Sequence, residues 1–184
     1  MTPNLSGLTI GSLALSPSFD KDVVEYTAGT TNAKDKVTAS ADASLTVAIE
    51  VNGTEIENES DATWTAGENT VEITVTNSAS VSKVYTVTVT QAPEAKLSGI
   101  TVGALTLTPT FDADVTEYAV TTSNNSNKVT ASAAEGLEIA LDLDGTEIEN
   151  ESSPTWEDGD NVLTITVSNE IGDSEEYVVT VTKE

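Results

Sequence analysis

The sequence predicts an all-β protein made of two copies of one domain, and three observations lead to this prediction. The chain aligns with itself without a gap when it is shifted by 92 residues, so that KVTAS at residues 36–40 meets KVTAS at residues 128–132. Short runs alternate between apolar and polar residues with the period of a β-strand. Thr and Val are abundant, and no segment has sustained helical periodicity. A gapless match of this length indicates two copies of one fold rather than two halves of a single domain.

The repeat predicts a domain boundary at the middle of the chain. We expect the first domain at residues 1–92 and the second at residues 93–184. The connector, residues 91–96, is short and contains one proline, Pro93. We therefore expect it to be fairly stiff, with limited swing between the domains.

Each copy contains runs that alternate as strands do, separated by turn signals. The clearest runs are residues 45–51, 71–75 and 85–89, with counterparts at residues 137–143, 163–167 and 177–181. Asn52-Gly53 and Asp144-Gly145 are signals for two-residue hairpins. Roughly seven short strands in about ninety residues predict two tandem immunoglobulin-like antiparallel β-sandwiches of about seven strands each.

The run GTEIENES occurs twice, at residues 53–60 and 145–152. Its glutamates raise the question of a duplicated cation-binding or catalytic site. After the turn glycine, strand alternation directs Thr54, Ile56 and Asn58 to one side and the three glutamates to the other. Carboxylates arranged in this way do not converge on one point. We therefore interpret the run as the outer face of a strand near a sheet edge, where charge hinders pairing with another chain.

Four aromatic residues, Phe19, Tyr26, Trp64 and Tyr85, recur at the same positions of the second copy. Each has a fixed place in the strand pattern, and large aromatic residues dominate cores of this size. We therefore interpret them as core residues rather than as a binding platform. The tryptophan follows the acidic run in each copy, so we expect it to cap one end of the core.

The composition excludes several function classes. The chain has 184 residues, with 31 acidic residues against 7 basic ones and a formal net charge of −24. Without arginine, histidine or cysteine, it cannot form a disulfide or a Ser–His–Asp triad, and it lacks the usual zinc, copper and haem ligands. The negative charge disfavours nucleic acid and anionic membranes as partners. No stretch is long and apolar enough for membrane insertion, and no signal peptide is visible.

The order of the motifs is informative: LSGLTIGSLALSPSFDKDVVEYT at residues 5–27, then KVTASA, NGTEI, W-x-x-G-E-N-x-V-x-I-x-V-x-N and VYTVTVT. This order resembles the cadherin-like β-sandwich domain of bacteria and their phages, and the resemblance covers both copies. It implies tandem, mostly non-enzymatic spacer or adhesive modules of secreted, surface-anchored or virion proteins. It does not imply calcium-dependent adhesion, because the D-x-N-D-N linker ligands are absent and the connector offers only Glu94.

The candidate metal ligands are Asp142, Asp144, Asp158 and Asp160, in two turns that resemble the start of calcium loops. A calcium site needs about six to eight oxygens around one point, and the first copy does not keep these acids. We therefore interpret the turns as hairpin turns, and predict no metal, no cofactor and no catalytic residue. Two carboxylates at the spacing of a glycosidase pair would arise by chance among so many acids, and nothing marks a cleft or a sugar platform.

The charge is divided unevenly between the copies. Residues 1–92 hold four lysines and twelve acidic residues, a net charge of −8, whereas residues 93–184 hold three lysines and nineteen acidic residues, a net charge of −16. This asymmetry indicates that the first copy packs on a partner while the second projects into solvent, where high charge maintains solubility. Drift after duplication is the alternative explanation.

These observations predict a non-enzymatic surface protein, with two competing hypotheses. The first is an accessory or decoration protein of a tailed phage virion, on the capsid or tail. A frame that runs from Met1 directly into the first strand and ends just after the last one fits this hypothesis. The alternative is a pair of spacer or adhesion repeats from a bacterial cell-surface or secreted protein, and a carbohydrate-binding or carbohydrate-active module is a remote third reading. We expect a protein partner in a capsid, tail or cell-wall assembly, with surface glycans and a homo-oligomer on the assembly as further options, and a location on a virion or a bacterial surface.

Overall fold

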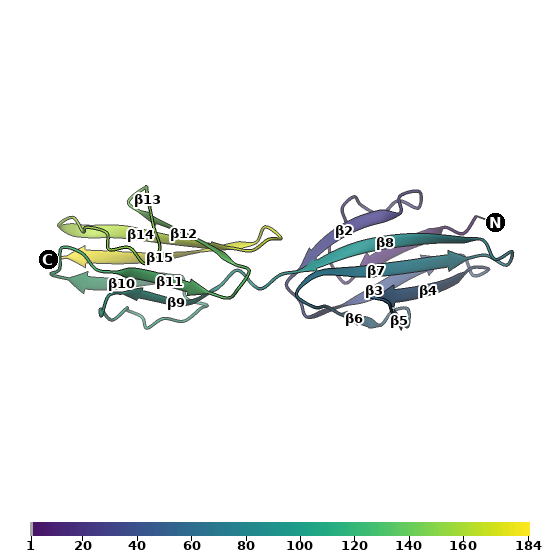
Figure 1. Ribbon diagram of the computed structural model, residues 1–184, viewed down its shortest axis with the longest axis horizontal. Helices are drawn as coiled ribbons and strands as arrows, with labels where there is room; N and C mark the ends of the chain where they lie inside the picture. The colour runs from purple at the N-terminus through teal and green to yellow at the C-terminus, as the bar shows by residue number, and fades with distance from the viewer. Residues whose placement is uncertain (1) are drawn as a thin grey trace. The chain divides into compact units, whose positions relative to one another are not determined.

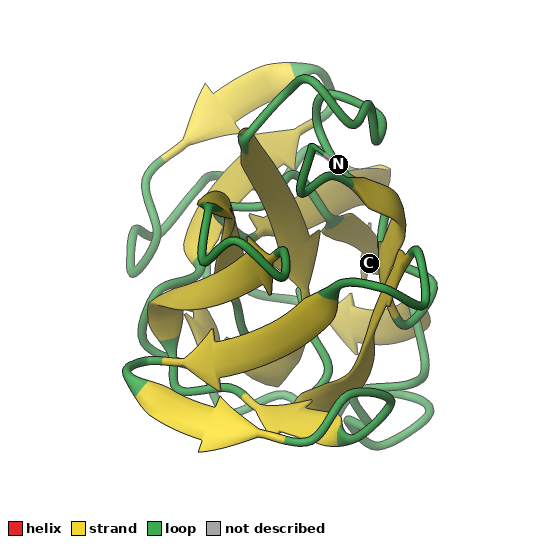
Figure 2. Cartoon of the chain, turned by 90° about the vertical axis from the view of Figure 1, so that its right-hand side faces the viewer, coloured by secondary structure: helices red, strands yellow, loops and turns green. Residues whose placement is uncertain are grey.

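The computed structural model describes residues 2–184, and within them the regular structure is β-strand only (Figures 1 and 2). The prediction of an all-β protein with two tandem sandwich-like domains is confirmed. The chain divides into two compact units, and the boundary between them along the sequence lies between Ala92 and Pro93. We call them unit 1 and unit 2 and describe each by itself. Met1, the start of the expected frame, lies outside the described residues. No helix in residues 2–184 is long and apolar enough to cross a membrane.

Unit 1 contains eight strands in two sheets. They are β1 (Leu5–Ile10), β2 (Glu25–Thr30), β3 (Lys34–Ala41), β4 (Thr46–Val51), β5 (Thr54–Ile56), β6 (Asp61–Thr63), β7 (Gly67–Thr76) and β8 (Ser82–Gln91). One sheet has the order β1-β3-β6 and the other the order β2-β8-β7-β4-β5. The expected alternation places one face of each strand in the core. The hairpin prediction is also confirmed, because Val51 pairs with Thr54 across Asn52-Gly53.

Unit 2 repeats this plan with seven strands. They are β9 (Leu97–Val102), β10 (Glu117–Thr122), β11 (Val129–Ala133), β12 (Glu138–Leu143), β13 (Thr146–Ile148), β14 (Gly159–Ser168) and β15 (Ser174–Lys183). The sheets are β11-β9 and β10-β15-β14-β12-β13. The counterpart of β6 is lost because Pro154 stands where unit 1 has Ala62. Proline has no N–H to give to the ladder, and only an isolated bridge between Ser126 and Thr155 remains.

One strand pair in each unit differs from the expected antiparallel pairing. β2 runs parallel to β8, and β10 runs parallel to β15. The other pairs of named strands are antiparallel. The segment between β1 and β2, residues 11–24, carries the chain from one sheet to the other. β2 therefore joins the free edge of β8 in the same direction as β8, without a hairpin between them.

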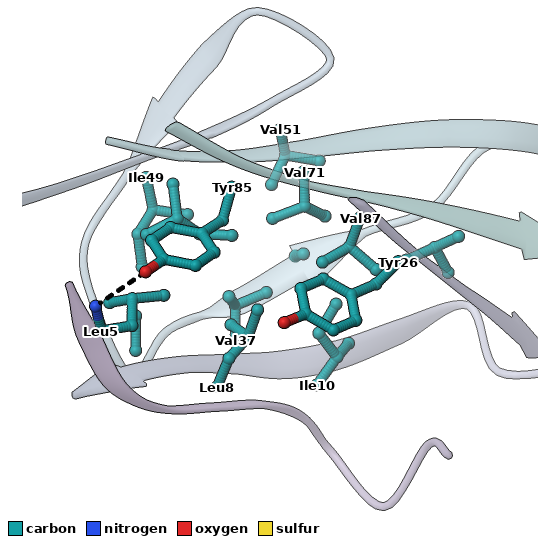
Figure 3. Packing of buried hydrophobic residues seen from close by; sticks show 14 of the residues in the cluster. Leu5, Leu8, Ile10, Tyr26, Val37, Ile49, Val51, Val71, Tyr85 and Val87 are labelled. Atoms are coloured by element: carbon teal, nitrogen blue, oxygen red, sulfur yellow. Dashed lines mark hydrogen bonds between the residues drawn. The ribbon is translucent and has the colours of Figure 1, made fainter. Parts of the chain in front are cut away.

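The core of unit 1 is a layer of aliphatic side chains between the two sheets, with tyrosine rings among them (Figure 3). The hydroxyl of Tyr85, a fully buried residue, accepts the N–H of Leu5 at 3.2 Å, a bond drawn in Figure 3. The same hydroxyl donates to the carbonyl oxygen of Lys21 at 2.7 Å. The interpretation of the repeated aromatic residues as core residues is confirmed, since Tyr26 and Trp64 are also buried and Phe19 packs against the rings of Tyr26 and Tyr85.

The tryptophans lie at the end of each core where the long strands β7 and β14 begin. Trp64 N–H bonds to the carbonyl of Ala33, one residue before β3, and its indole Nε1 donates to Asp35 Oδ2 at 2.9 Å. Trp156 Nε1 donates in the same way to Asn127 Oδ1 at 3.0 Å. Both tryptophans are buried, and their position agrees with the expected cap at one end of the core.

Candidate functional site

The long segment that joins the two sheets is held in place by tyrosine hydroxyls. Tyr26 Oη lies 2.6 Å from the carbonyl oxygen of Asp20 and 2.9 Å from that of Val23, and it accepts the N–H of Asp20 at 3.2 Å. Tyr118 makes the same contacts to Asp112 and Val115 in unit 2. These hydroxyls are therefore engaged with backbone groups and are part of the scaffold.

A surface depression lies beside this segment in each unit, at equivalent positions. In unit 2 it has a volume of about 430 Å³ and is lined by Thr108, Glu117, Tyr118, Ala119, Val178 and Thr180. In unit 1 it has a volume of about 280 Å³ and is lined by Ser16, Glu25, Tyr26, Thr27, Thr86 and Thr88. Ala119 in place of Thr27 and Val178 in place of Thr86 make the depression in unit 2 less polar.

The chemistry that these depressions offer is limited. Each is lined by a single carboxylate, Glu25 or Glu117, among threonine and serine hydroxyls and apolar groups. Glycoside hydrolysis uses two carboxylates, one as acid and one as base or nucleophile. One carboxylate among hydroxyl groups suits hydrogen bonding to a polar ligand rather than acid–base catalysis.

The candidate metal ligands lie in two turns, and each carboxylate already has a protein partner. Asp142 Oδ1 accepts the N–H of Gly145 at 2.7 Å, and Asp144 Oδ1 accepts the N–H of Val162 at 2.9 Å. Asp158 Oδ1 lies 3.0 Å from Lys183 Nζ, and Asp160 Oδ1 accepts the hydroxyl of Thr182 at 2.6 Å. Within residues 2–184, no three acidic side chains are placed to hold one ion.

The GTEIENES run differs from the expected continuous strand. Thr54–Ile56 form β5 at the edge of the five-stranded sheet, so the edge position is confirmed. The strand ends at Ile56, however, and Glu59 adopts a left-handed conformation with φ 65°. The interpretation of three glutamates along one strand face was therefore wrong for Glu57 and Glu59. After β5 the chain turns away and crosses to the other sheet.

Asn58 secures this crossing. Its carboxamide acts as a substitute strand, because Oδ1 accepts the N–H of Ala39 at 2.9 Å while Nδ2 donates to the carbonyl oxygen of Ala39 at 2.8 Å. Asn150 makes the same pair of bonds to Ala131 at 3.0 and 2.8 Å. We call this arrangement the asparagine clamp. It satisfies the edges of β3 and β11, which a second chain would otherwise be able to pair with.

The strand register brings further glutamates into one row. On the outer face of the five-stranded sheet, Glu50 stands directly opposite Glu55 on one side and Glu72 on the other. Like charges at directly opposed positions destabilise a sheet. In unit 2, Asp142 replaces Glu50. It still stands opposite an acid, Glu147, on one side, but it faces Thr164 on the other side. Unit 2, although more acidic overall, thus keeps the repulsion between β12 and β13 and lacks the one between β12 and β14.

Lysine side chains form exposed ion pairs at several points. Lys96, at the start of unit 2, lies 2.7 Å from Asp114 and 3.2 Å from Glu94. Hydrogen bonds to Asp114 and then to Glu94 raise the pKa of Lys96 well above its ordinary value. Exposed pairs contribute little to stability. Pro93 is also held to unit 2, since its carbonyl oxygen accepts Nδ2 of Asn169 at 2.9 Å.

The fold and these sites define the chain as a tandem of immunoglobulin-like sandwich modules. In both modules, equivalent tyrosine and asparagine side chains form hydrogen bonds to backbone groups. A family comparison agrees, since the cadherin-like beta sandwich domain matches residues 5–92 and 102–184. The chain belongs to the cadherin-like β-sandwich domain family, which confirms the resemblance found in the sequence. Comparison with curated proteins gives no match.

Solved structures with similar folds include modules from several kinds of protein. The fibronectin(III)-like modules of Clostridium thermocellum CbhA are 14% identical, with 97% of this chain and 94% of that chain covered and a TM-score of 0.33. An I-band fragment of titin is 12% identical, with coverages of 100% and 66% and a TM-score of 0.37. Drosophila N-cadherin EC1-4 is 12% identical, with coverages of 88% and 48% and a TM-score of 0.31. At these identities the likeness concerns the fold alone.

Membership in this family suggests a non-enzymatic structural or adhesion module. Such domains are commonly extracellular or displayed on a surface. Sequence reasoning missed the asparagine clamp. The signal was present, because Asn58 and Asn150 stand at equivalent positions inside an identical run. Alternation placed Asn58 on the side of Ile56, but it did not indicate that the carboxamide would bond to the backbone of β3.

Proposed function

We propose that the chain is a structural module displayed on an assembly, namely an accessory or decoration protein on the capsid or tail of a tailed phage virion. One observation carries the non-enzymatic part of this proposal. The repeated tyrosines and asparagines are engaged with backbone: the tyrosine hydroxyls hold the segment between the sheets, and Asn58 and Asn150 hold strand edges. Residues selected for catalysis would instead project into a shared cleft.

The charge distribution supports different roles for the two units. Unit 1, with a net charge of −8, is the attachment module, and unit 2, with a net charge of −16, projects into solvent. Strong like charge on neighbouring copies keeps a crowded surface soluble and separate. We also propose that residues 1–92 and 93–184 fold as independent domains, so that either can be presented without the other.

The test is to locate the native protein. Tailed phage particles and bacterial cell walls are purified from the same culture, and each fraction is analysed by intact mass and peptide mapping. Recovery from the particles at the mass of the 184-residue chain supports the proposal. Recovery only as part of a longer polypeptide in the cell wall refutes it and establishes the second candidate, a pair of spacer or adhesion repeats. The tandem duplication itself favours that candidate, because spacer proteins lengthen by repeating modules.

The attachment face and the absence of catalysis are tested separately. Cross-linking on intact particles is expected to join lysines of unit 1, such as Lys21 and Lys36, to particle proteins, and to leave Lys128 of unit 2 without such cross-links. Preferential cross-linking through Lys128 would reverse the assignment of the two units. Incubation with a panel of glycans is expected to give no turnover, and release of any product would show that the module is an enzyme.

A further inference from the structure

The β4–β5 hairpin contains a chemically reactive pair that the proposed function does not use. Asn52-Gly53 is the one Asn–Gly sequence in the chain. Both residues are exposed, and both have positive φ, 49° for Asn52 and 77° for Gly53. Glycine has no Cβ to shield its nitrogen, and a Cβ at this position would have no atom within 4 Å. The backbone nitrogen that follows the Asn52 side chain is therefore accessible.

That nitrogen also donates no hydrogen bond within residues 2–184. The last ladder pair of the hairpin is Val51 with Thr54, so Gly53 lies outside the ladder. Among the described residues, no acceptor bonds the N–H of Gly53, whereas in unit 2 the N–H of Gly145 donates to Asp142 Oδ1 at 2.7 Å. Unit 1 has Glu50 in place of Asp142 and lacks this bond. The glycine nitrogen, which is the potential nucleophile, thus donates a hydrogen bond in unit 2 and lacks this bond in unit 1.

The carboxamide of Asn52 is polarised by its neighbours. Its Oδ1 accepts the N–H of Thr70 at 2.9 Å, and its Nδ2 donates to Asn69 Oδ1 at 3.0 Å. A donor on the carbonyl oxygen stabilises the negative charge that develops there when a nucleophile adds to Cγ. The N–H of Thr70 is such a donor to the carbonyl oxygen of the Asn52 side chain.

Unit 2 shows that the product of such a reaction fits the turn. Its hairpin has Asp144-Gly145 at the equivalent position, with φ values of 51° and 83° close to those of Asn52 and Gly53. Asp144 Oδ1 accepts the N–H of Val162 at 2.9 Å, as Asn52 Oδ1 accepts that of Thr70. An aspartate at position 52 would keep this bond, so conversion to aspartate is compatible with the hairpin.

We propose that Asn52 is a site of spontaneous deamidation through a succinimide. The nitrogen of Gly53 attacks Cγ of Asn52, a new C–N bond closes the ring, and the Cγ–Nδ2 bond breaks. Nδ2 leaves as ammonia and takes up the proton that the Gly53 nitrogen loses. Water then opens the ring at either carbonyl, giving aspartate or isoaspartate, and no other reactant is needed. The product carries one more negative charge on an already acidic unit.

The test uses the full chain, incubated folded at mildly alkaline pH with circular dichroism to verify the fold. Peptide mapping by mass spectrometry is expected to show a rise of about 1 Da at Asn52. Conversion there should be about tenfold or more faster than at any other asparagine, with Asn58 and Asn77 as internal references. An isoaspartate methyltransferase assay detects the second product. Asn52→Asp should show no rise, and Gly53→Ala should slow conversion because its Cβ shields the nitrogen.

The same incubation in urea provides the reference that makes the result decisive. Conversion at Asn52 in the folded chain at a rate comparable with that of the unfolded chain supports the proposal. Conversion in urea but none in the folded chain would show that the turn protects Asn52 and would overturn it. Equal conversion at Asn52 and the reference asparagines would overturn it as well. None of these outcomes depends on where the protein is displayed.

Discussion

Replacing Asn58 with alanine tests the asparagine clamp directly. The substitution leaves the N–H and the carbonyl oxygen of Ala39 without partners, and Ala39 is only 3% exposed. An unpaired buried backbone group costs about 1–3 kcal/mol, and part of this is recovered where water reaches the edge, so we expect a loss of about 2–4 kcal/mol. For a domain of this size, that loss corresponds to roughly 10–30 °C in the melting temperature of unit 1.

The assay exploits the single tryptophan in each unit. In a Trp156→Phe background, fluorescence during urea or thermal unfolding reports Trp64 and therefore unit 1. Glu57→Ala, at an exposed neighbour in the same turn, is the matched control and should change stability by less than about 0.5 kcal/mol. Asn58→Asp should be as damaging as Asn58→Ala, because a carboxylate cannot donate to the carbonyl oxygen of Ala39. The reasoning is refuted if Asn58→Ala unfolds at the same urea concentration and temperature as the Glu57→Ala control.

Three further predictions concern charges. Glu72→Thr, which copies the residue at position 164, should stabilise unit 1 by about 0.2–1 kcal/mol by removing the repulsion with Glu50, and urea unfolding should show the gain shrinking in high salt. Hydrogen bonds from Ser44, first from its backbone N–H, lower the pKa of Asp42 from its usual 3.8. This contribution is present above pH 3.8 and is lost as pH falls through the lower native value, so Asp42→Asn should slightly lower the melting temperature at neutral pH and not in strong acid; an equal deficit at both pH values would contradict the assignment. Millimolar calcium should leave melting temperatures nearly unchanged because the turn aspartates already bond to the protein, and a large rise would show that they bind the ion.

Much of the fold could be predicted because its signals are local. Alternation along a strand shows which side chains are buried, and Asn52-Gly53 specifies a two-residue turn through positive φ at both positions. The self-match at a shift of 92 residues extends each local prediction to the second copy. These features depend on residues close together in the sequence, and they are confirmed.

The features that could not be predicted depend on which distant segments meet. β2 pairs in parallel with β8 because the segment after β1 changes sheets, and no residue in β2 specifies that partner. The strand after the hairpin ends at Ile56 because Asn58 binds β3. The loss of the β6 counterpart through Pro154 becomes evident only once Asp35 and Ala62 are known to be paired. The asparagine clamp therefore could not be predicted from the pattern of apolar and polar residues.

The parallel pairing of β2 with β8 gives each unit a preferred response to mechanical load. The start of β2 and the end of β8 lie at opposite ends of the pair. Once β1 has separated from β3, tension applied along the chain therefore pulls β2 and β8 past each other. The six matched residue pairs from Glu25 with Thr86 to Thr30 with Gln91 then carry the force together. A hairpin pulled apart at its open end would instead release its bonds one after another. In a module anchored at one end and pulled at the other, the β2–β8 ladder would therefore fail as a unit rather than one residue pair at a time.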